Sequence, residues 1–172
     1  MMLDRILFSE AQIAERVKQL SAEISKDYQN KNPLFIGVLT GSFIFYADLI
    51  RSFDFDCSAD FIAVESYGAS TTSSGTVTLR LETKTPLTGR DIVIVEDILD
   101  TGYTLQRVIN LLIEHNPASI KICVLLDKAE RRKVPIYADY VGFTIPDEFV
   151  VGYGLDFNEH WRNLPYISTV AE

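Results

Sequence analysis

The sequence has few of the residues from which metal clusters and disulfide-stabilised folds are built. Its 172 residues include two cysteines, Cys57 and Cys123, and two histidines, His115 and His160. Two cysteines make neither a disulfide framework nor a zinc cluster. The histidines lie too far apart in the sequence to suggest a metal site. The sequence therefore gives no indication of a disulfide-rich or zinc-binding protein.

Long apolar runs and a basic leader are also missing. No segment is long enough to cross a membrane. The first residues, MMLDRILFSEAQ, lack the basic start and long apolar stretch of a signal peptide. We therefore expect a cytosolic protein. The length suits one domain over residues 1–172, and 47% apolar with 23% charged residues is ordinary for a soluble globular protein.

The sequence also lacks an excess of basic residues: 16 lysines and arginines face 24 acids, and the formal net charge is −8. Partners such as nucleic acids and anionic membranes require a basic face, so we expect neither. Two nucleotide-binding motifs are missing as well. The sequence has no G-x-x-x-x-G-K-[ST], and after Gly152-x-Gly154 it places Phe157 where a dinucleotide fingerprint needs its third glycine.

The most informative segment present is VIVEDILDTGYTL, residues 93–105. An apolar run ends in Glu96 and Asp97, and a helical pattern begins after Thr104. This order predicts a buried strand, a tight loop and a helix. Small residues in such a loop leave backbone N–H groups free to bind a phosphate at the helix N-terminus. The acids suit sugar hydroxyls, a metal ion or a proton in transit.

The rest of the chain alternates between strand and helix patterns. Ser9 and Gln12 form a capping box ahead of helically spaced apolar residues. Residues 42–53 indicate a second helix. Residues 68–75 are small and polar, hence flexible. Strands are predicted at 34–39, 59–64, 77–81, 120–126, 140–145 and 149–153. Strands separated by helices favour a mainly parallel sheet covered on both faces, with 77–81 as an antiparallel excursion.

The segment EDILDTGYT, together with five others between Leu39 and Arg162, resembles the purine phosphoribosyltransferases, and among them the hypoxanthine-guanine enzymes. The resemblance implies an α/β fold with a mainly parallel central sheet flanked by helices, as in type I phosphoribosyltransferases. A small hood from the terminal segments and a flexible lid loop complete it. The implied activity transfers the 5-phosphoribosyl group from phosphoribosyl pyrophosphate to hypoxanthine or guanine, with Mg²⁺, in purine salvage. The implied assembly is a homodimer or homotetramer.

The resemblance also implies a role for each matching residue. The backbone of Thr40 and Gly41 contacts pyrophosphate, with a cis peptide that maps to the bond between them. Ser66 and Tyr67 belong to the lid. Lys128 donates to the oxygen of a 6-oxopurine. Phe149 stacks on the purine, and the backbone of Val150 binds its edge.

The remaining implied roles concern the phosphates, the ribose and the metal. The 5′-phosphate is held by the loop Asp100, Thr101, Gly102, Tyr103 and Thr104. Glu96 and Asp97 hold the ribose hydroxyls, directly or through Mg²⁺. Asp156 is a further metal ligand and Arg162 contacts pyrophosphate. The implied metal ligands are thus Glu96, Asp97 and Asp156.

Several alternatives remain open at this point. Asp100 is the candidate catalytic base, or it only orients the phosphate loop. Either Arg131 or Arg132 contacts substrate, and Arg132 is favoured. A non-catalytic or RNA-binding regulator with the same fold is the alternative function, although a charge of −8 opposes RNA binding. The triplet Asp100-Thr101-Gly102 also occurs in aspartic proteases, but here a helical pattern follows it.

Overall fold

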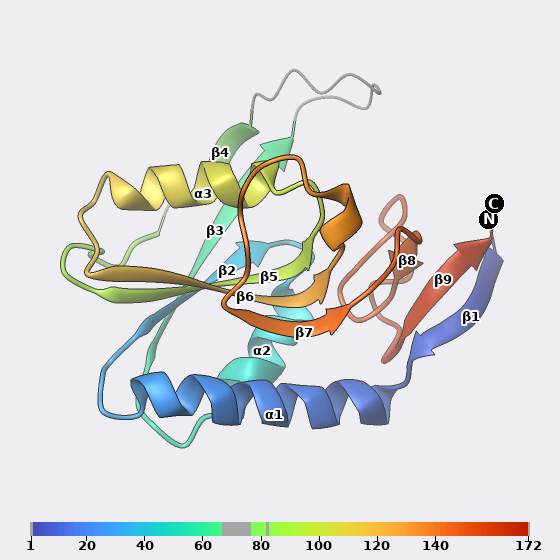
Figure 1. Cartoon of the computed structure of the whole chain (residues 1–172), viewed down its shortest axis with the longest axis horizontal. Helices are drawn as coiled ribbons and strands as arrows, with labels where there is room; N and C mark the ends of the chain where they lie inside the picture. The colour runs from blue at the N-terminus through green and yellow to red at the C-terminus, as the bar shows by residue number, and fades with distance from the viewer. Residues whose placement is uncertain (1, 67–76, 82, 172) are drawn as a thin grey trace.

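The computed structural model describes residues 2–66, 77–81 and 83–171 (Figure 1). Tyr67 and most of the predicted lid lie outside the described residues. The elements are β1 (Met2–Phe8), α1 (Glu10–Tyr28), β2 (Leu34–Leu39), α2 (Phe43–Arg51), β3 (Ser58–Ser66), β4 (Val77–Leu81), β5 (Asp91–Leu99), α3 (Tyr103–Ile113), β6 (Ser119–Asp127), the 3₁₀ helix η1 (Ala129–Arg131), β7 (Tyr140–Thr144), β8 (Val150–Val151) and β9 (Ile167–Ala171).

A central sheet has the strand order β4-β3-β2-β5-β6-β7. The five strands from β3 to β7 in this order are parallel, and β4 pairs antiparallel to β3. The predicted α/β class and the antiparallel excursion are both confirmed. In a parallel sheet the carboxyl ends of the strands share one edge, and ligands bind beyond that edge. The ends of β2, β5 and β6 therefore set the position of the site.

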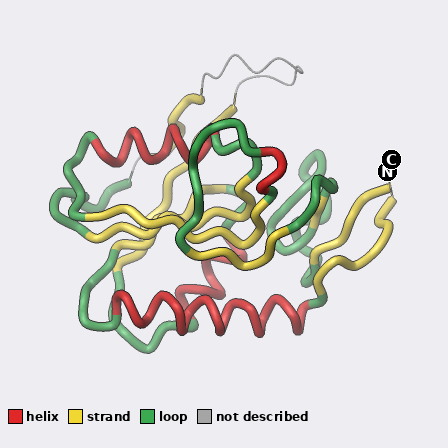
Figure 2. Tube along the Cα trace, viewed as in Figure 1, coloured by secondary structure: helices red, strands yellow, loops and turns green. Residues whose placement is uncertain are grey.

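Helices cover both faces of this sheet (Figures 1 and 2). On one face, α1 and α2 pack against the sheet around Leu20, Ile24 and Phe45, which are fully buried. On the other face, α3 contributes Leu105, Val108 and Leu112 to a second buried cluster. Two buried faces explain why β2 and most of β5 are uninterrupted apolar runs.

The two ends of the described chain form a separate small sheet with the order β1-β9-β8 (Figure 1). Met2 pairs with Ala171, and Val150 with Thr169. This sheet is the hood implied by the resemblance. The prediction that residues 149–153 close the central sheet was wrong, because Val150 and Val151 pair with β9 instead.

Two local predictions can be compared with the structure directly. The capping box of α1 is present, since Ser9 accepts from the Gln12 backbone and the Gln12 side chain accepts from the Ser9 backbone. The strand before the central loop is longer than predicted. It continues through Glu96 and Asp97 to Leu99, because Ile98 and Leu99 pair with β6. None of the described helices is both long and apolar enough to span a membrane.

Candidate active site

The loop from β5 to α3 presents a helix N-terminus to a small cavity of about 190 Å³. Gly102 caps the helix with φ +90°, a conformation that favours glycine. The first turn of α3 has no acidic residue and no side-chain cap, so its N–H groups and dipole can attract an anion. Asp100, Thr101, Gly102 and Thr104 line this cavity; Tyr103 is exposed and is not among its lining residues.

Glu96 and Asp97 lie at the same edge, near the end of β5. Glu96 is buried, and its Oε2 has no hydrogen-bond partner within the described part of the chain. Burial, and then the charge of Asp97, raise the pKa of Glu96 well above its usual value. Burial also raises the pKa of Asp97, although the positive charge of Arg162 opposes the shift. These adjacent carboxylates, of which Glu96 is buried and Asp97 half-buried, would be stabilised in their charged forms by a nearby cation.

The corner between β2 and α2 contacts this acid pair. A Cβ built on Gly41 would lie 1.8 Å from Oδ2 of Asp97, so a larger residue would have to displace either the carboxylate or the corner. The cis peptide joins Leu39 to Thr40, one bond before the position that the resemblance implied, and that prediction is corrected. Ser42 does not cap α2 with its side chain; its hydroxyl donates to the carbonyl oxygen of Val38 at 2.6 Å.

A second cavity of about 580 Å³ lies beside the first, between the sheet edge and the hood. The predicted residues Asp97, Asp100, Lys128, Phe149, Val150 and Asp156 all line it. Lys128 follows β6 and is buried, whereas the ring of Phe149 is 51% exposed and meets Phe157 edge-on. An exposed aromatic ring beside a buried ammonium group can stack on a flat ligand while the lysine donates to it.

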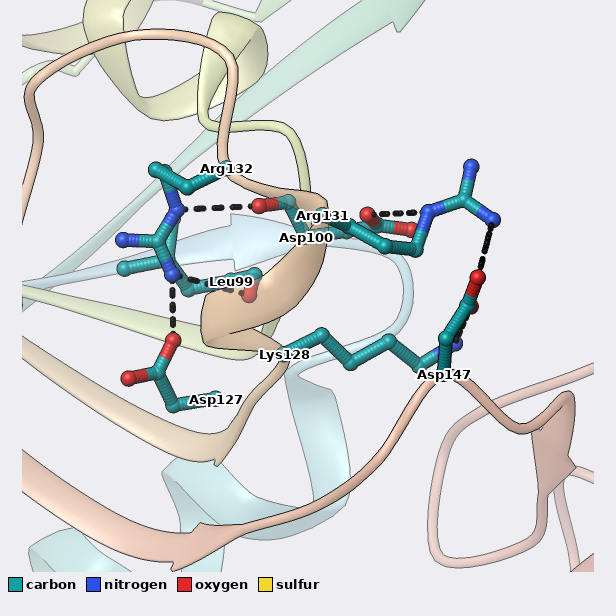
Figure 3. Close-up of polar contacts among 7 residues, drawn as sticks. All are labelled: Leu99, Asp100, Asp127, Lys128, Arg131, Arg132 and Asp147. Carbon is teal, nitrogen blue, oxygen red and sulfur yellow. Dashed lines mark hydrogen bonds and ion pairs between the residues drawn. The ribbon is translucent and has the colours of Figure 1, made fainter.

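Arg131 and Arg132 point in different directions from the segment around η1 (Figure 3). Arg132 donates to the carbonyl oxygens of Leu99, Asp100 and Ile136 and to the Asp127 carboxylate. It therefore anchors the backbone of the phosphate loop, and it is not among the residues that line the larger cavity. Arg131 does line that cavity, with Nε 2.8 Å from Oδ1 of Asp100.

Asp156 and Arg162 come from the loop between β8 and β9. Arg162 pairs with Asp156 at 2.8 Å and donates to the carbonyl oxygen of Gly154, while its Nε is buried and has no partner among the described residues. In the part of the chain that the structure describes, no three acid, histidine or cysteine side chains form a ready metal cage. Nevertheless, a divalent cation could bind at Glu96, because its Oε2 has no hydrogen-bond partner from the described residues and the carboxylate of Asp97 is adjacent.

Sequence reasoning missed one charged residue of the larger cavity, Asp147. Its carboxylate lies 3.8 Å from Nζ of Lys128 and 3.2 Å from a terminal nitrogen of Arg131. The only signal in the sequence was its position two residues before Phe149. The side chain of Ser66 belongs to the part of the site that is not described, so the lid pair stays a prediction.

Comparison with known proteins places this geometry in a family. The family model for the phosphoribosyl transferase domain matches residues 6–158. The hypoxanthine-guanine phosphoribosyltransferase of Lactococcus lactis is 51% identical over 98% of this chain and 91% of its own length, and that of Bacillus subtilis is 49% identical over 98% and 93%. A crystal structure of the Bacillus anthracis hypoxanthine-guanine phosphoribosyltransferase, with a HEPES molecule in its active site, has a TM-score of 0.95 at 46% identity, covering 99% of this chain and all of that one.

The chain belongs to the hypoxanthine-guanine phosphoribosyltransferase family. It is thus a phosphoribosyltransferase, an enzyme of the glycosyltransferase class. The family match includes both acids of β5, the phosphate loop, Lys128, Phe149 and Asp156, while Arg162 lies just beyond it. The similarity to a known enzyme extends beyond that region. The match to the Bacillus anthracis structure covers 99% of this chain, which includes the hood.

Proposed function

We propose that this phosphoribosyltransferase transfers the 5-phosphoribosyl group from phosphoribosyl pyrophosphate to hypoxanthine or guanine. The products are IMP or GMP and pyrophosphate, and the role is purine salvage. One observation carries the proposal. A single cavity brings a buried lysine and an exposed aromatic ring together with acids at the end of β5, directly beside an uncapped helix N-terminus.

The smaller cavity holds the 5′-phosphate of the sugar. The N–H groups at the start of α3 and the hydroxyls of Thr101 and Thr104 bind it. Glu96 and Asp97 hold the ribose hydroxyls, directly or through the metal. Gly41 brings the backbone of the β2–α2 corner into contact with Asp97. In this position the backbone of the corner contacts the pyrophosphate, together with Arg162.

Glu96, Asp97 and Asp156 are the residues that hold Mg²⁺ in this proposal. Their carboxylate oxygens are the ligands that Mg²⁺ prefers. When bound, Mg²⁺ supplies positive charge to the leaving pyrophosphate. The carboxylates also stabilise the positive charge that develops on the ribose in an oxocarbenium-like transition state.

The purine lies in the larger cavity, stacked on Phe149. Lys128 donates to the 6-oxo group, and the backbone of Val150 binds the base edge. Asp100 accepts the proton that leaves the imidazole ring of the purine as the new bond to the ribose forms. Adenine presents an amino donor to Lys128, and leaving buried donors unpaired costs roughly 1–3 kcal/mol.

The setting of the reaction belongs to the same proposal. The chain acts as one domain over residues 1–172, in the cytosol, as a homodimer or homotetramer. Its membership in a family of purine enzymes supports the cytosolic setting.

The test is product formation from phosphoribosyl pyrophosphate and each of hypoxanthine, guanine, xanthine and adenine, with Mg²⁺ or with a chelator. We expect IMP and GMP with one pyrophosphate per turnover, no product in the chelator, and turnover of adenine reduced at least 10-fold. Robust formation of AMP, or full activity in the chelator, would refute the proposal. A protein that makes no nucleotide from any base refutes it outright.

A further inference from the structure

Four charged side chains form a continuous chain of contacts along the larger cavity (Figure 3). Nε of Arg131 lies 2.8 Å from Oδ1 of Asp100, and its terminal nitrogen lies 3.2 Å from Oδ1 of Asp147. The same oxygen of Asp147 lies 3.8 Å from Nζ of Lys128. Asp100 and Lys128 already have roles toward the purine. Arg131 and Asp147, which connect them, have none.

The contact between Arg131 and Asp100 leaves an acceptor open. Oδ1 of Asp100 is buried, yet it accepts no aligned hydrogen bond from the described residues, even though Nε of Arg131 is only 2.8 Å away. The guanidinium group therefore attracts the carboxylate by charge from a direction off the hydrogen-bonding line.

Arg131 is itself held in place from the other side. Its side chain is 45% exposed, and a long exposed side chain loses much conformational entropy when it is fixed. Asp147 offsets this cost by contacting a terminal nitrogen through both carboxylate oxygens, at 3.2 and 3.4 Å. The hydrogen bond that Arg131 donates to Asp147, and then the charge of Asp100, raise the pKa of Arg131. The arginine thus bridges two carboxylates.

The neighbouring arginine fixes the other half of Asp100. Nε of Arg132 donates to the carbonyl oxygen of Asp100 at 2.9 Å. The backbone of Asp100 is thereby held by Arg132 and its carboxylate by Arg131. Two consecutive arginines of one short segment therefore fix the same acid, and only Arg131 does so inside the cavity.

We propose that Arg131 is a positioning residue for the proton transfer: held by Asp147, it keeps the Asp100 carboxylate where the imidazole N–H of the purine arrives. The inference rests on the proposed function. In the step concerned, the purine N–H bond breaks and its proton goes to Asp100. The electron pair stays on the ring as the purine nitrogen bonds to the ribose and pyrophosphate departs. Arg131 neither gives nor takes a proton.

The experiment compares single-turnover rates at saturating substrates with the purine dissociation constant. Arg131→Ala should lower the rate about 10-fold or more, because small misplacements of reacting groups are costly. It should change the purine dissociation constant less than about 3-fold. Arg131→Lys keeps the charge and should recover part of the rate. Arg107→Ala removes an exposed arginine from α3 and should match the wild type.

A double-mutant cycle separates positioning from a general structural effect. In the Asp100→Asn background, Arg131→Ala should lower the rate no further, because the group that it positions is gone. Additive losses would overturn the inference, as would an unchanged rate in Arg131→Ala alone. Tighter purine binding at an unchanged rate would also overturn it, because Arg131 would then only obstruct the cavity.

The outcomes for this inference and for the proposed function can be told apart. An active wild type together with a full-rate Arg131→Ala variant overturns the positioning role and leaves the proposed function intact. A wild type that forms no nucleotide overturns both. Thermal unfolding of each variant shows whether a lost rate reflects a lost fold.

Discussion

Gly41 is the residue at which the site leaves least room. An added methyl group would meet Oδ2 of Asp97 at 1.8 Å, so either the corner or the carboxylate would have to move. Gly41→Ala should therefore raise the KM for phosphoribosyl pyrophosphate about 10-fold or more, since a displacement of 1 Å at such a site is costly. Steady-state kinetics with varied phosphoribosyl pyrophosphate measures this effect.

A matched control for this change exists at the opposite end of β5. A Cβ at Gly89 meets no atom within 4 Å, and its φ of +71° is a conformation that asparagine tolerates. Gly89→Asn should leave the KM as it is. Equal effects of the two substitutions would mean that the close contact at Gly41 does not matter for binding.

Asp100 is the proposed general base, which accepts the proton of the purine. Asp100→Asn keeps the shape of the side chain and removes the base, so the single-turnover rate at saturating substrates should fall about 10²–10⁴-fold. Substrate dissociation constants should change little. If the rate stays the same and only the affinity for phosphoribosyl pyrophosphate falls, then Asp100 orients the phosphate loop and is not the base.

At the residue scale, the sequence allowed the position of a side chain to be predicted where a motif fixes it at a strand end, while the role of that side chain stays a prediction. Lys128 after β6 and Phe149 before β8 both reach the cavity as expected. The bridge between Arg131 and Asp147 joins residues 16 positions apart. It depends on how η1 and the segment before β8 are placed in space, which no local pattern specifies. The choice between Arg131 and Arg132 as the substrate contact depends on the same placement in space, because both lie on one short segment, and the preference for Arg132 stays a prediction.

At the scale of elements, the sequence predicted the strands that are buried but not the strand that is mostly exposed. Strands β2 and β6 were predicted because their apolar runs are buried on both faces. Most residues of β1 are exposed, so its sequence lacks the alternation that marks a half-buried strand. Its strand state depends on pairing with β9, at the other end of the described chain. Only the family resemblance indicated a hood.

The junction between α1 and the sheet should make stability depend on pH. Hydrogen bonds from Lys121, and then from Tyr140, lower the pKa of Asp27 below its ordinary value of 3.8. A lowered pKa in the folded state stabilises the fold above the unfolded-state pKa, and this contribution is lost as the pH falls through the folded-state value. The effect should therefore disappear below about pH 4.

Denaturant unfolding of the wild type and Asp27→Asn between pH 7 and pH 2.5 measures this contribution. At pH 7 the variant should be less stable by about 0.2–1 kcal/mol, the range of partly exposed ion pairs. The two proteins should converge at the acidic end. Asp54→Asn, at an exposed acid after α2, should differ from the wild type by a constant amount. A difference in the free energy of unfolding between the wild type and Asp27→Asn that does not depend on pH would contradict this prediction.

At the scale of the whole molecule, the chain is acidic but concentrates positive groups where an anionic substrate would bind. The formal net charge is −8, yet a helix N-terminus, Lys128, Arg131 and Arg162 gather around the two cavities. The acids Glu96 and Asp97 lie at the same sheet edge, where the proposed Mg²⁺ would offset their charge. The central sheet makes this possible because the ends of β2, β5 and β6 share one edge.

A third cavity gives a clear alternative location for a ligand. It has a volume of about 510 Å³ and lies between α1, α2 and the loop from β8 to β9, with Ile13, Val17 and Tyr153 among its lining residues. It contains none of the residues assigned to the purine or the phosphates. No substrate of the proposed reaction is expected to bind there.

A crystal structure of the protein with IMP tests the central claim most directly. We expect the purine ring on Phe149, the 6-oxo group within about 3.2 Å of Nζ of Lys128, and the 5′-phosphate at the N-terminus of α3. IMP bound in the cavity between α1, α2 and the β8–β9 loop, or with its phosphate away from α3, would contradict the proposed function.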